Sequence, residues 1–139
     1  MERASSALSV FRWQAEIMVG HVGIVDRRVA RGGVPIRVAG IQSLAVAPRW
    51  RKSGLSQRLM TTAVHEARRR GLCFGLLFCM PELESFYARL GWRRIDRAVT
   101  MRDGAGRTVP LTAKNIAMEL ALAGDPLPPG AIDLEGRDW

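Results

Sequence analysis

The segment Val46-Ala47-Pro48-Arg49-Trp50-Arg51-Lys52-Ser53-Gly54-Leu55-Ser56 decides the fold expected of this chain, because it joins a predicted strand to a predicted helix. At such a join, several backbone N–H groups of the first helical turn point to one spot, and the helix dipole adds positive potential there. Gly54 lets a ligand approach the backbone closely, and Arg51 and Lys52 add positive charge. These features indicate either a phosphate-binding loop or an ordinary capped helix start. The G-x-x-x-x-G-K-[ST] spacing of nucleotide-hydrolysing P-loops is absent.

Apolar periodicity predicts the elements that flank this segment. Leu55, Leu59 and Ala63 recur at four-residue spacing, as on the buried face of a helix, and Gly71 suits the C-terminal cap. The predicted order is strand, strand, helix, strand, helix, strand, strand, at residues 11–28, 34–46, 54–70, 72–80, 82–90, 92–101 and 112–122, with turns at 31–33 and 103–104. This order predicts a mixed α/β sheet with a helix on each of two crossovers.

Length and composition favour one ordinary globular domain over residues 1–139, with irregular ends at 1–10 and 125–139. Apolar residues make up 47% of the chain and charged residues 24%, which is enough for a core and argues against wholesale disorder. The apolar runs are far shorter than the roughly 20 residues that a membrane helix needs. The first residues lack a signal-peptide pattern, so we expect a cytoplasmic protein without a membrane partner.

The net charge of +8 is unevenly distributed. Residues 27–70 contain eleven Lys or Arg and one acid, whereas residues 71–139 contain eight basic and nine acidic residues. A basic half suits phosphate groups, either of a nucleic acid or of a small cofactor. The aromatic residues are few and are not interleaved with the basic ones as a base-stacking surface requires, so no nucleic-acid partner is expected.

Cys73 and Cys79 lie in the same predicted strand. Six residues of strand span about 20 Å, which exceeds the reach of a disulfide. We expect both side chains to be buried thiols and expect no metal site.

Two motifs resemble those of the GNAT superfamily of N-acetyltransferases. Arg51-x-x-Gly54-x-Ser56 resembles the acetyl-CoA signature [Q/R]-x-x-G-x-[G/A], with serine as the last small residue. F-Y-A-R-L-G-W at residues 86–92 resembles the F-Y-x-x-x-G-[F/W] segment that follows this signature in sequences of the same family. The likeness covers residues 18–122. It implies a GNAT-like, mostly antiparallel mixed sheet flanked by helices, and an enzyme that moves an acetyl group from acetyl-CoA to a primary amine.

The resemblance also implies site residues. The pantetheine arm and the pyrophosphate of acetyl-CoA would be held by Leu44, Ala45, Val46, Arg51, Lys52, Ser53, Gly54, Leu55 and Ser56. Tyr87, which is the only tyrosine, matches the tyrosine that serves the family as the acid for the leaving thiolate. The alternative for Tyr87 is core packing beside Phe86.

The general base is less clearly indicated. Many family members use an acid on the strand before the phosphate loop, but residues 34–46 contain none, and Gln42 and Ser43 could only hold a water. We take Glu82 as the catalytic candidate for this role. Other candidates are Asp26, His21 and the carboxylates of the tail, with structural or solvated roles as the alternative for each.

The two ends of the chain suggest an acceptor and an assembly. The segments G-H-V-G-I-V-D-R at residues 20–27, G-L-L-F-C at 75–79 and G-A-I-D-L-E-G-R-D-W at 130–139 resemble a bacterial subgroup related to aminoglycoside 2′-N-acetyltransferases. In that subgroup the chain also ends in tryptophan, and the tail lies near the acceptor site. The acidic tail, with Asp125, Asp133, Glu135 and Asp138, suits a small cationic amine such as an aminoglycoside. A protein N-terminus, a lysine, or a non-catalytic CoA-binding role remain alternatives. The part before the hairpin is shorter than in the superfamily, so we expect an uncovered strand edge and a homodimer.

Overall fold

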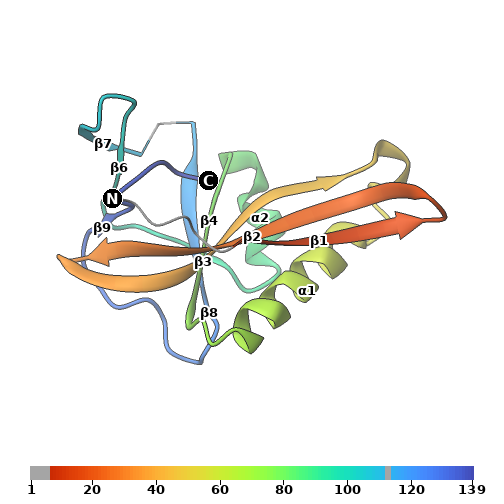
Figure 1. Ribbon diagram of the computed structural model, residues 1–139, viewed down its shortest axis with the longest axis horizontal. Coiled ribbons are helices and arrows are strands. Elements are labelled where there is room, and N and C mark those ends of the chain that lie inside the picture. Colours follow the sequence, from red (N-terminus) through yellow and green to blue (C-terminus); the bar gives the residue numbers. More distant parts are fainter. Residues whose placement is uncertain (1–6, 112–113) are drawn as a thin grey trace.

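The computed structural model describes residues 7–111 and 114–139, which form one strongly curved mixed sheet with helices packed against it (Figure 1). Within these residues the strand order is β5-β8-β4-β3-β2-β9-β6-β7, and β1 pairs with β2. Most neighbours are antiparallel, whereas β3–β4 and β6–β9 are parallel. The prediction of a mostly antiparallel mixed sheet flanked by helices is confirmed.

The first three strands form an antiparallel meander: β1 (Ala7–Gln14), β2 (Ile17–Arg31) and β3 (Val34–Val46). Two predictions were wrong here: residues 7–10 belong to a strand and not to an irregular end, and residues 11–28 do not form one strand; residues 1–6 of the predicted irregular end lie outside the described residues. The chain turns at Ala15 and Glu16, with Ala15 at φ 56°, so that Ala7–Gln14 becomes a strand of its own. Neither turn residue is Gly, Pro, Asn or Asp, so the usual turn signal is missing.

Helix α1 (Leu55–Arg69) covers one face of β1–β3. It is preceded in the chain by one turn of 3-10 helix, η1 (Pro48–Trp50). Its bounds agree with the prediction to within a residue. The buried positions are Leu55, Leu59, Met60, Ala63 and Ala67, as the four-residue spacing indicated. The helix lies close to the sheet because β2 carries Gly20 beneath it, where an added Cβ would lie 2.8 Å from Leu59 Cδ1.

The second half of the chain supplies the remaining elements. They are β4 (Phe74–Cys79), η2 (Pro81–Leu83), α2 (Glu84–Ala88), β5 (Arg93–Arg94), β6 (Val99–Arg102), β7 (Thr108–Pro110), β8 (Ile116–Ala121) and β9 (Ile132–Asp133). The single strand predicted at 92–101 is two strands, because β5 pairs with β8 while β6 pairs with β7 and β9. The turn predicted at 103–104 joins β6 to β7, and β8 begins later than expected; residues 112–113 lie outside the described residues.

Apart from the short strand β9, residues 125–139 form no helix or strand, yet the tail is packed against the sheet. Leu127, Ile132 and Leu134 are buried in a second apolar cluster on the face of the sheet opposite α1. Trp139 lies over Gly40 on that face, and its indole Nε1 donates a hydrogen bond to the Leu76 carbonyl at 3.1 Å. Apolar side chains at alternate positions near the end of the chain therefore close the second core.

The two cysteines differ in their surroundings. Cys79 is buried, as expected, whereas Cys73 is exposed because it precedes β4 instead of lying within it. Both thiols are free.

Candidate active site

The neighbouring strands β3 and β4 separate at the point where the site forms. They pair only over Ala39–Ile41 and Gly75–Leu77. From Gln42 onward, the β4-facing edge of β3 has no strand partner among the described residues. A parallel pair that diverges leaves a gap, into which backbone polar groups of β3 point without a protein partner.

A β-bulge in β3 sets the orientation of its last residues. His21 pairs with Ala45 and Gly23 with Gln42, so Ser43 and Leu44 together lie opposite the single residue Val22. Ser43 has φ 56°. The bulge inverts the alternation of the strand, because Ile41 before it and Leu44 after it both pack toward α1.

The orientation of the last N–H groups of β3 follows from one hydrogen bond. Ala47 N–H donates to the Val19 carbonyl of β2 at 2.8 Å. Since successive N–H groups of a strand point to opposite edges, the N–H groups of Val46 and Leu44 point away from β2, into the gap beside β4. Arg51 is on the same side, because its Nε donates to the Val46 carbonyl at 3.3 Å.

The start of α1 presents further unpaired donors. Gly54, at φ 84°, and Lys52, at φ 66°, turn the chain into the helix. Ser53 Oγ accepts a hydrogen bond from Leu55 N–H at 3.3 Å, but the N–H groups of Ser56 and Gln57 have no acceptor within the described part of the chain. A helix start with free N–H groups is a binding site for an anion.

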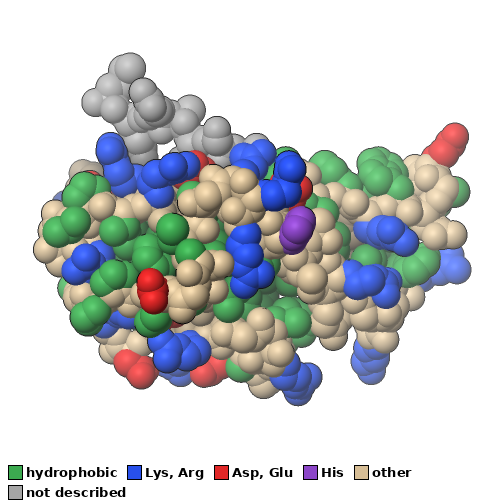
Figure 2. Space-filling view, turned by 90° about the horizontal axis from the view of Figure 1, so that it is seen from below, with side chains coloured by type: hydrophobic (Ala, Val, Ile, Leu, Met, Phe, Trp, Pro, Cys, Tyr) green, Lys and Arg blue, Asp and Glu red, His purple; other side chains and the backbone are tan. Residues whose placement is uncertain are grey.

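A third cation lies at this loop and was not singled out from the sequence. A Cβ added at Gly54 would lie 3.8 Å from Nη1 of Arg58, so this guanidinium reaches back along the helix toward its first turn. Arg58 follows Gly54 by four residues, a spacing that places both on one face of a helix, and that spacing was the available signal. Figure 2 shows that Lys and Arg side chains are spread over the surface seen from below, where few acidic side chains appear.

A cavity of about 380 Å³ lies in the gap between β3 and α2. It is lined by Leu44, Ala45, Val46, Arg51, Ser56, Leu83, Phe86 and Tyr87. The structure thus brings together one end of the predicted cofactor site and the predicted acid, which are more than thirty residues apart in sequence. Lys52, Ser53 and Gly54 continue the loop outside the lining, and the Leu55 side chain is buried in the core, so that only its backbone can face a ligand.

Tyr87 enters the cavity from α2 as a neutral phenol. The residue is 8% exposed, its ring packs edge-on against Phe86 with centroids 4.9 Å apart, and its hydroxyl has no hydrogen-bond partner among the described residues. Burial, with a smaller contribution from the nearby Cys79, raises the pKa of Tyr87 from 10.0 to about 12. Burial and the Glu84 carboxylate likewise raise the pKa of the Cys79 thiol. Both groups therefore hold their protons at neutral pH, and Tyr87 can donate one into the cavity.

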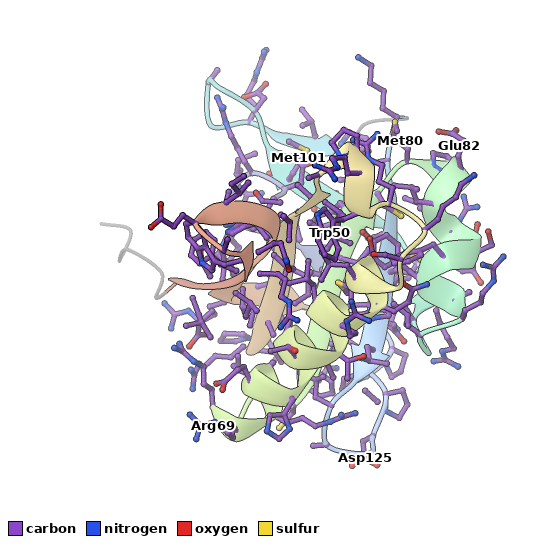
Figure 3. The ribbon with its side chains drawn as sticks, turned by 90° about the vertical axis from the view of Figure 1, so that its right-hand side faces the viewer. Trp50, Arg69, Met80, Glu82, Met101 and Asp125 are labelled. Carbon is purple, nitrogen blue, oxygen red and sulfur yellow. The ribbon has the colours of Figure 1, made fainter. Side chains whose placement is uncertain are left out.

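The structure does not bring Glu82 to the cavity. Glu82 is exposed in η2 and lies at the outer margin of the molecule beyond α2, whereas Trp50 lies near the centre, beside the start of α1 (Figure 3). The neighbouring Leu83 lines the cavity instead. Two other candidate carboxylates are already paired, Asp26 with Arg37 and Asp133 with Arg102 at 2.8 Å.

Residues 7–111 and 114–139 contain no cluster of three His, Cys, Asp or Glu side chains with the spacing of a metal site. Among the same residues, no helix has the length and apolar character needed to cross a bilayer.

The sequence and the fold both resemble those of known proteins. Residues 3–95, more than half of the chain, match the family model for the acetyltransferase (GNAT) domain. A GCN5-related N-acetyltransferase from Kribbella flavida is 28% identical with a TM-score of 0.52; the match covers 57% of this chain but only 20% of that one.

Two other solved structures show the same fold. The ribosomal-protein-S18-alanine N-acetyltransferase from Escherichia coli has a TM-score of 0.60 at 20% identity, over 86% of this chain and 71% of its own. An aminoglycoside 6′-N-acetyltransferase complexed with coenzyme A has a TM-score of 0.62 at 17% identity, over 86% of this chain and 75% of its own.

Proposed function

This chain belongs to the GNAT family of acetyltransferase domains, and from that premise we propose that it binds acetyl-CoA in the gap between β3 and β4 and transfers the acetyl group to a primary amine. The cavity carries this proposal, because it joins the free edge of β3, the start of α1 and the Tyr87 phenol in one space. A ligand that is extended at one end and polyanionic at the other suits such a space.

The anionic part of acetyl-CoA would lie on the loop. The pyrophosphate would accept hydrogen bonds from the first-turn N–H groups of α1 and from Arg51, with Lys52 and Arg58 adding charge. The pantetheine arm would extend β3 as an additional strand, bonded to the N–H group of Val46. In this placement the thioester lies near the bulge, at the inner end of the cavity.

The chemistry would then use two groups of this chain. The Leu44 N–H, beside the bulge, would donate a hydrogen bond to the thioester oxygen as negative charge develops on it. Tyr87 would give its proton to the departing thiolate, as its neutral state at physiological pH permits.

For the acceptor, we propose a small cationic amine, of which an aminoglycoside is an example. The support is electrostatic: the tail that packs over Gly40 ends with Asp138 beside Trp139, on the face of the sheet opposite the basic helix α1. From the residues that the structure describes, Asp138 Oδ2 accepts only a 3.5 Å contact, from Asn115 Nδ2, and it keeps acceptor capacity for an ammonium group. The resemblance to the aminoglycoside 2′-N-acetyltransferase subgroup favours the same class, whereas the fold shared with an enzyme of ribosomal-protein S18 keeps a protein N-terminus as the second candidate.

We also propose that the protein forms a homodimer. Strand β1 pairs only with β2 among the described residues, so its outer edge is open. Large apolar side chains are exposed on β1 and at the start of β2, including Phe11 at 48%, Trp13 at 55% and Ile17 at 69%. An open edge beside exposed apolar side chains favours pairing with a second copy.

Calorimetric titration with acetyl-CoA and a thiol-release assay test the proposal together. Arg51→Ala should weaken acetyl-CoA binding by about 1–3 kcal/mol, a 5- to 150-fold rise in Kd, since one charge-assisted hydrogen bond is lost. Arg49→Ala is the matched control, because Arg49 is exposed in η1 and does not line the cavity.

The acceptor panel contains tobramycin, spermidine and a peptide with a free N-terminal alanine. Thiol release with the two polycations supports the small cationic acceptor, and release with the peptide alone replaces it with a protein substrate. Equal losses of binding in both arginine variants would contradict the placement of the cofactor.

A further inference from the structure

The residues that line the cavity include no carboxylate and no imidazole. An amine acceptor is protonated at neutral pH, and it must lose a proton before its lone pair can attack a thioester. A group beside the cavity, on the face from which the acceptor approaches, must therefore take this proton. β3 offers none, because the side chains before the phosphate loop are apolar or neutral apart from Arg37.

His21 of β2 lies one strand away from the cavity, on the face of the sheet opposite α1. Its Cα pairs with that of Ala45, which lines the cavity, and residues directly opposite in an antiparallel pair point to the same face. Gly20, the preceding residue, faces α1, so His21 faces the opposite side of the sheet, where the tail is packed. His21 is half-buried, and the Phe11 ring of β1 packs against its imidazole at a centroid distance of 4.9 Å.

The β3 bulge fixes the tautomer of this histidine. Nδ1 lies 2.9 Å from the carbonyl oxygen of Ser43, the residue at φ 56°. A carbonyl oxygen can only accept, so Nδ1 carries the hydrogen and the lone pair is on Nε2. Nε2 has no hydrogen-bond partner within residues 7–111 and 114–139. The arrangement matches that of a general base, in which one ring nitrogen is held by the backbone and the other is presented to a substrate.

The groups that face the imidazole are neutral. They are Phe11 from β1 and, from β3, the Ser43 carbonyl and the Ala45 side chain. No carboxylate of the described residues is within ion-pair distance of the ring. No carboxylate therefore competes with Nε2 for the proton of an incoming ammonium group.

We propose that His21 is the catalytic base that deprotonates the acceptor amine; this role rests on the proposed function. Nε2 takes a proton from the ammonium group, and the imidazolium later releases it to solvent. The freed lone pair forms the C–N bond to the thioester carbon, and the C–S bond breaks as the tetrahedral intermediate collapses. The thiolate takes the phenol proton of Tyr87, and the phenolate recovers a proton from the new amide nitrogen, so that one acetylamine, one CoA thiol and one proton are formed.

The test is the pH dependence of kcat/KM in His21→Asn, with His65→Asn as the matched control. The asparagine amide can keep the donor to the Ser43 carbonyl but has no base, whereas His65 is exposed on α1. With tobramycin as acceptor, His21→Asn should lose about 10²-fold at pH 7, and the loss should shrink toward pH 9.5, where more of the amine is already neutral. His65→Asn should match the wild type, and the acetyl-CoA affinity should be unchanged in both variants.

A second probe removes the dependence on tobramycin. Hydrolysis of acetyl-CoA, with water as acceptor, also needs a base and should fall at least about 10-fold in His21→Asn. If His21→Asn does not fold, His21→Gln is measured in the same way. A loss that is equal at all pH values, or no loss, overturns the role of His21 while leaving the proposed function intact. A wild type that releases thiol with neither tobramycin nor water, nor with any amine of the panel, overturns the proposed function and the role of His21 with it.

Discussion

Replacement of Tyr87 by phenylalanine tests whether Tyr87 is a proton donor or only a packing residue. The change removes one hydroxyl that has no hydrogen-bond partner among the described residues, so the fold should lose little stability at neutral pH. If the phenol protonates the leaving thiolate, kcat should fall by about 10²-fold or more, which corresponds to about 3 kcal/mol of activation free energy. The Kd for acetyl-CoA should change little, because the ring and its contact with Phe86 remain.

The assay is thiol release at saturating acetyl-CoA, with Ser85→Ala as the control. Ser85 is exposed on the same helix and does not line the cavity, so its loss removes a hydroxyl from α2 without touching the site. A Tyr87→Phe enzyme that keeps kcat within a factor of three of the wild type would show that Tyr87 only packs the cavity wall.

The pKa of Tyr87 adds an independent measurement. Above pH 10 the phenol of the unfolded chain ionises, while the folded chain keeps its proton until about pH 12, since burial raises the pKa of Tyr87 to that value. The folded state then binds more protons, so the stabilising contribution is complete below pH 10 and is lost as the pH rises through 12. The difference corresponds to about 3 kcal/mol.

Urea unfolding of the wild type and of Tyr87→Phe between pH 9 and 12 measures this contribution. The wild type should lose stability relative to the variant across this range. Because Tyr87 is the only tyrosine, the phenolate absorbance of the folded protein reports its titration directly. A phenol that titrates near pH 10 in the folded protein would refute the burial that raises its pKa.

Three further outcomes are expected. Gly54→Asp should abolish acetyl-CoA binding in calorimetry, because a carboxylate would lie at the anion site; Gly54→Asn, which tolerates the positive φ of 84° but carries no charge, should retain much more of it. Removal of Asp138 and Trp139 should raise KM for the amine and leave the acetyl-CoA Kd unchanged, and Gly40→Ala should do the same, since its Cβ would lie 2.6 Å from the Trp139 ring; unaltered amine kinetics would exclude the tail from the acceptor site. Sedimentation at micromolar concentration should show a dimer that Trp13→Glu converts to a monomer, and a monomeric wild type would rule the dimer out.

The helix that follows the phosphate loop was predictable because its signals are local. Leu55, Leu59 and Ala63 repeat at helical spacing, and Gly54 and Gly71 mark its two ends, so that α1 was predicted almost to the residue. No spacing of residues in the sequence predicts that Tyr87 and Arg51 line the same cavity. It depends on where β3 and β4 separate, which is a property of strand pairing, and only the resemblance to a family suggested it.

Features that depend on long-range packing could not be predicted from residue types. Nothing at Ser43 signals a bulge, since Gly and Pro are absent there, and the turn at Ala15 and Glu16 is equally unmarked. The prolines and glycines of the tail account for its lack of regular secondary structure, but residue type alone does not show that Leu134 is fully buried by neighbours far away in sequence. Glu82 was chosen for its charge and position on a short helix, but residue type does not show which side of that helix faces the cavity.

The separation of β3 from β4 also has a consequence for the exchange of single amide hydrogens with solvent. Ala47 N–H is bonded to Val19 at 2.8 Å and should exchange slowly, whereas the adjacent Val46 N–H, which points into the gap, should exchange at a rate near that of an unprotected amide. Two neighbours on one segment would then differ by orders of magnitude in an otherwise well-folded sheet. Occupation of the gap by an extended ligand would slow the exchange of the Val46 N–H and leave that of Ala47 as it was, so one backbone hydrogen would report that the gap is occupied.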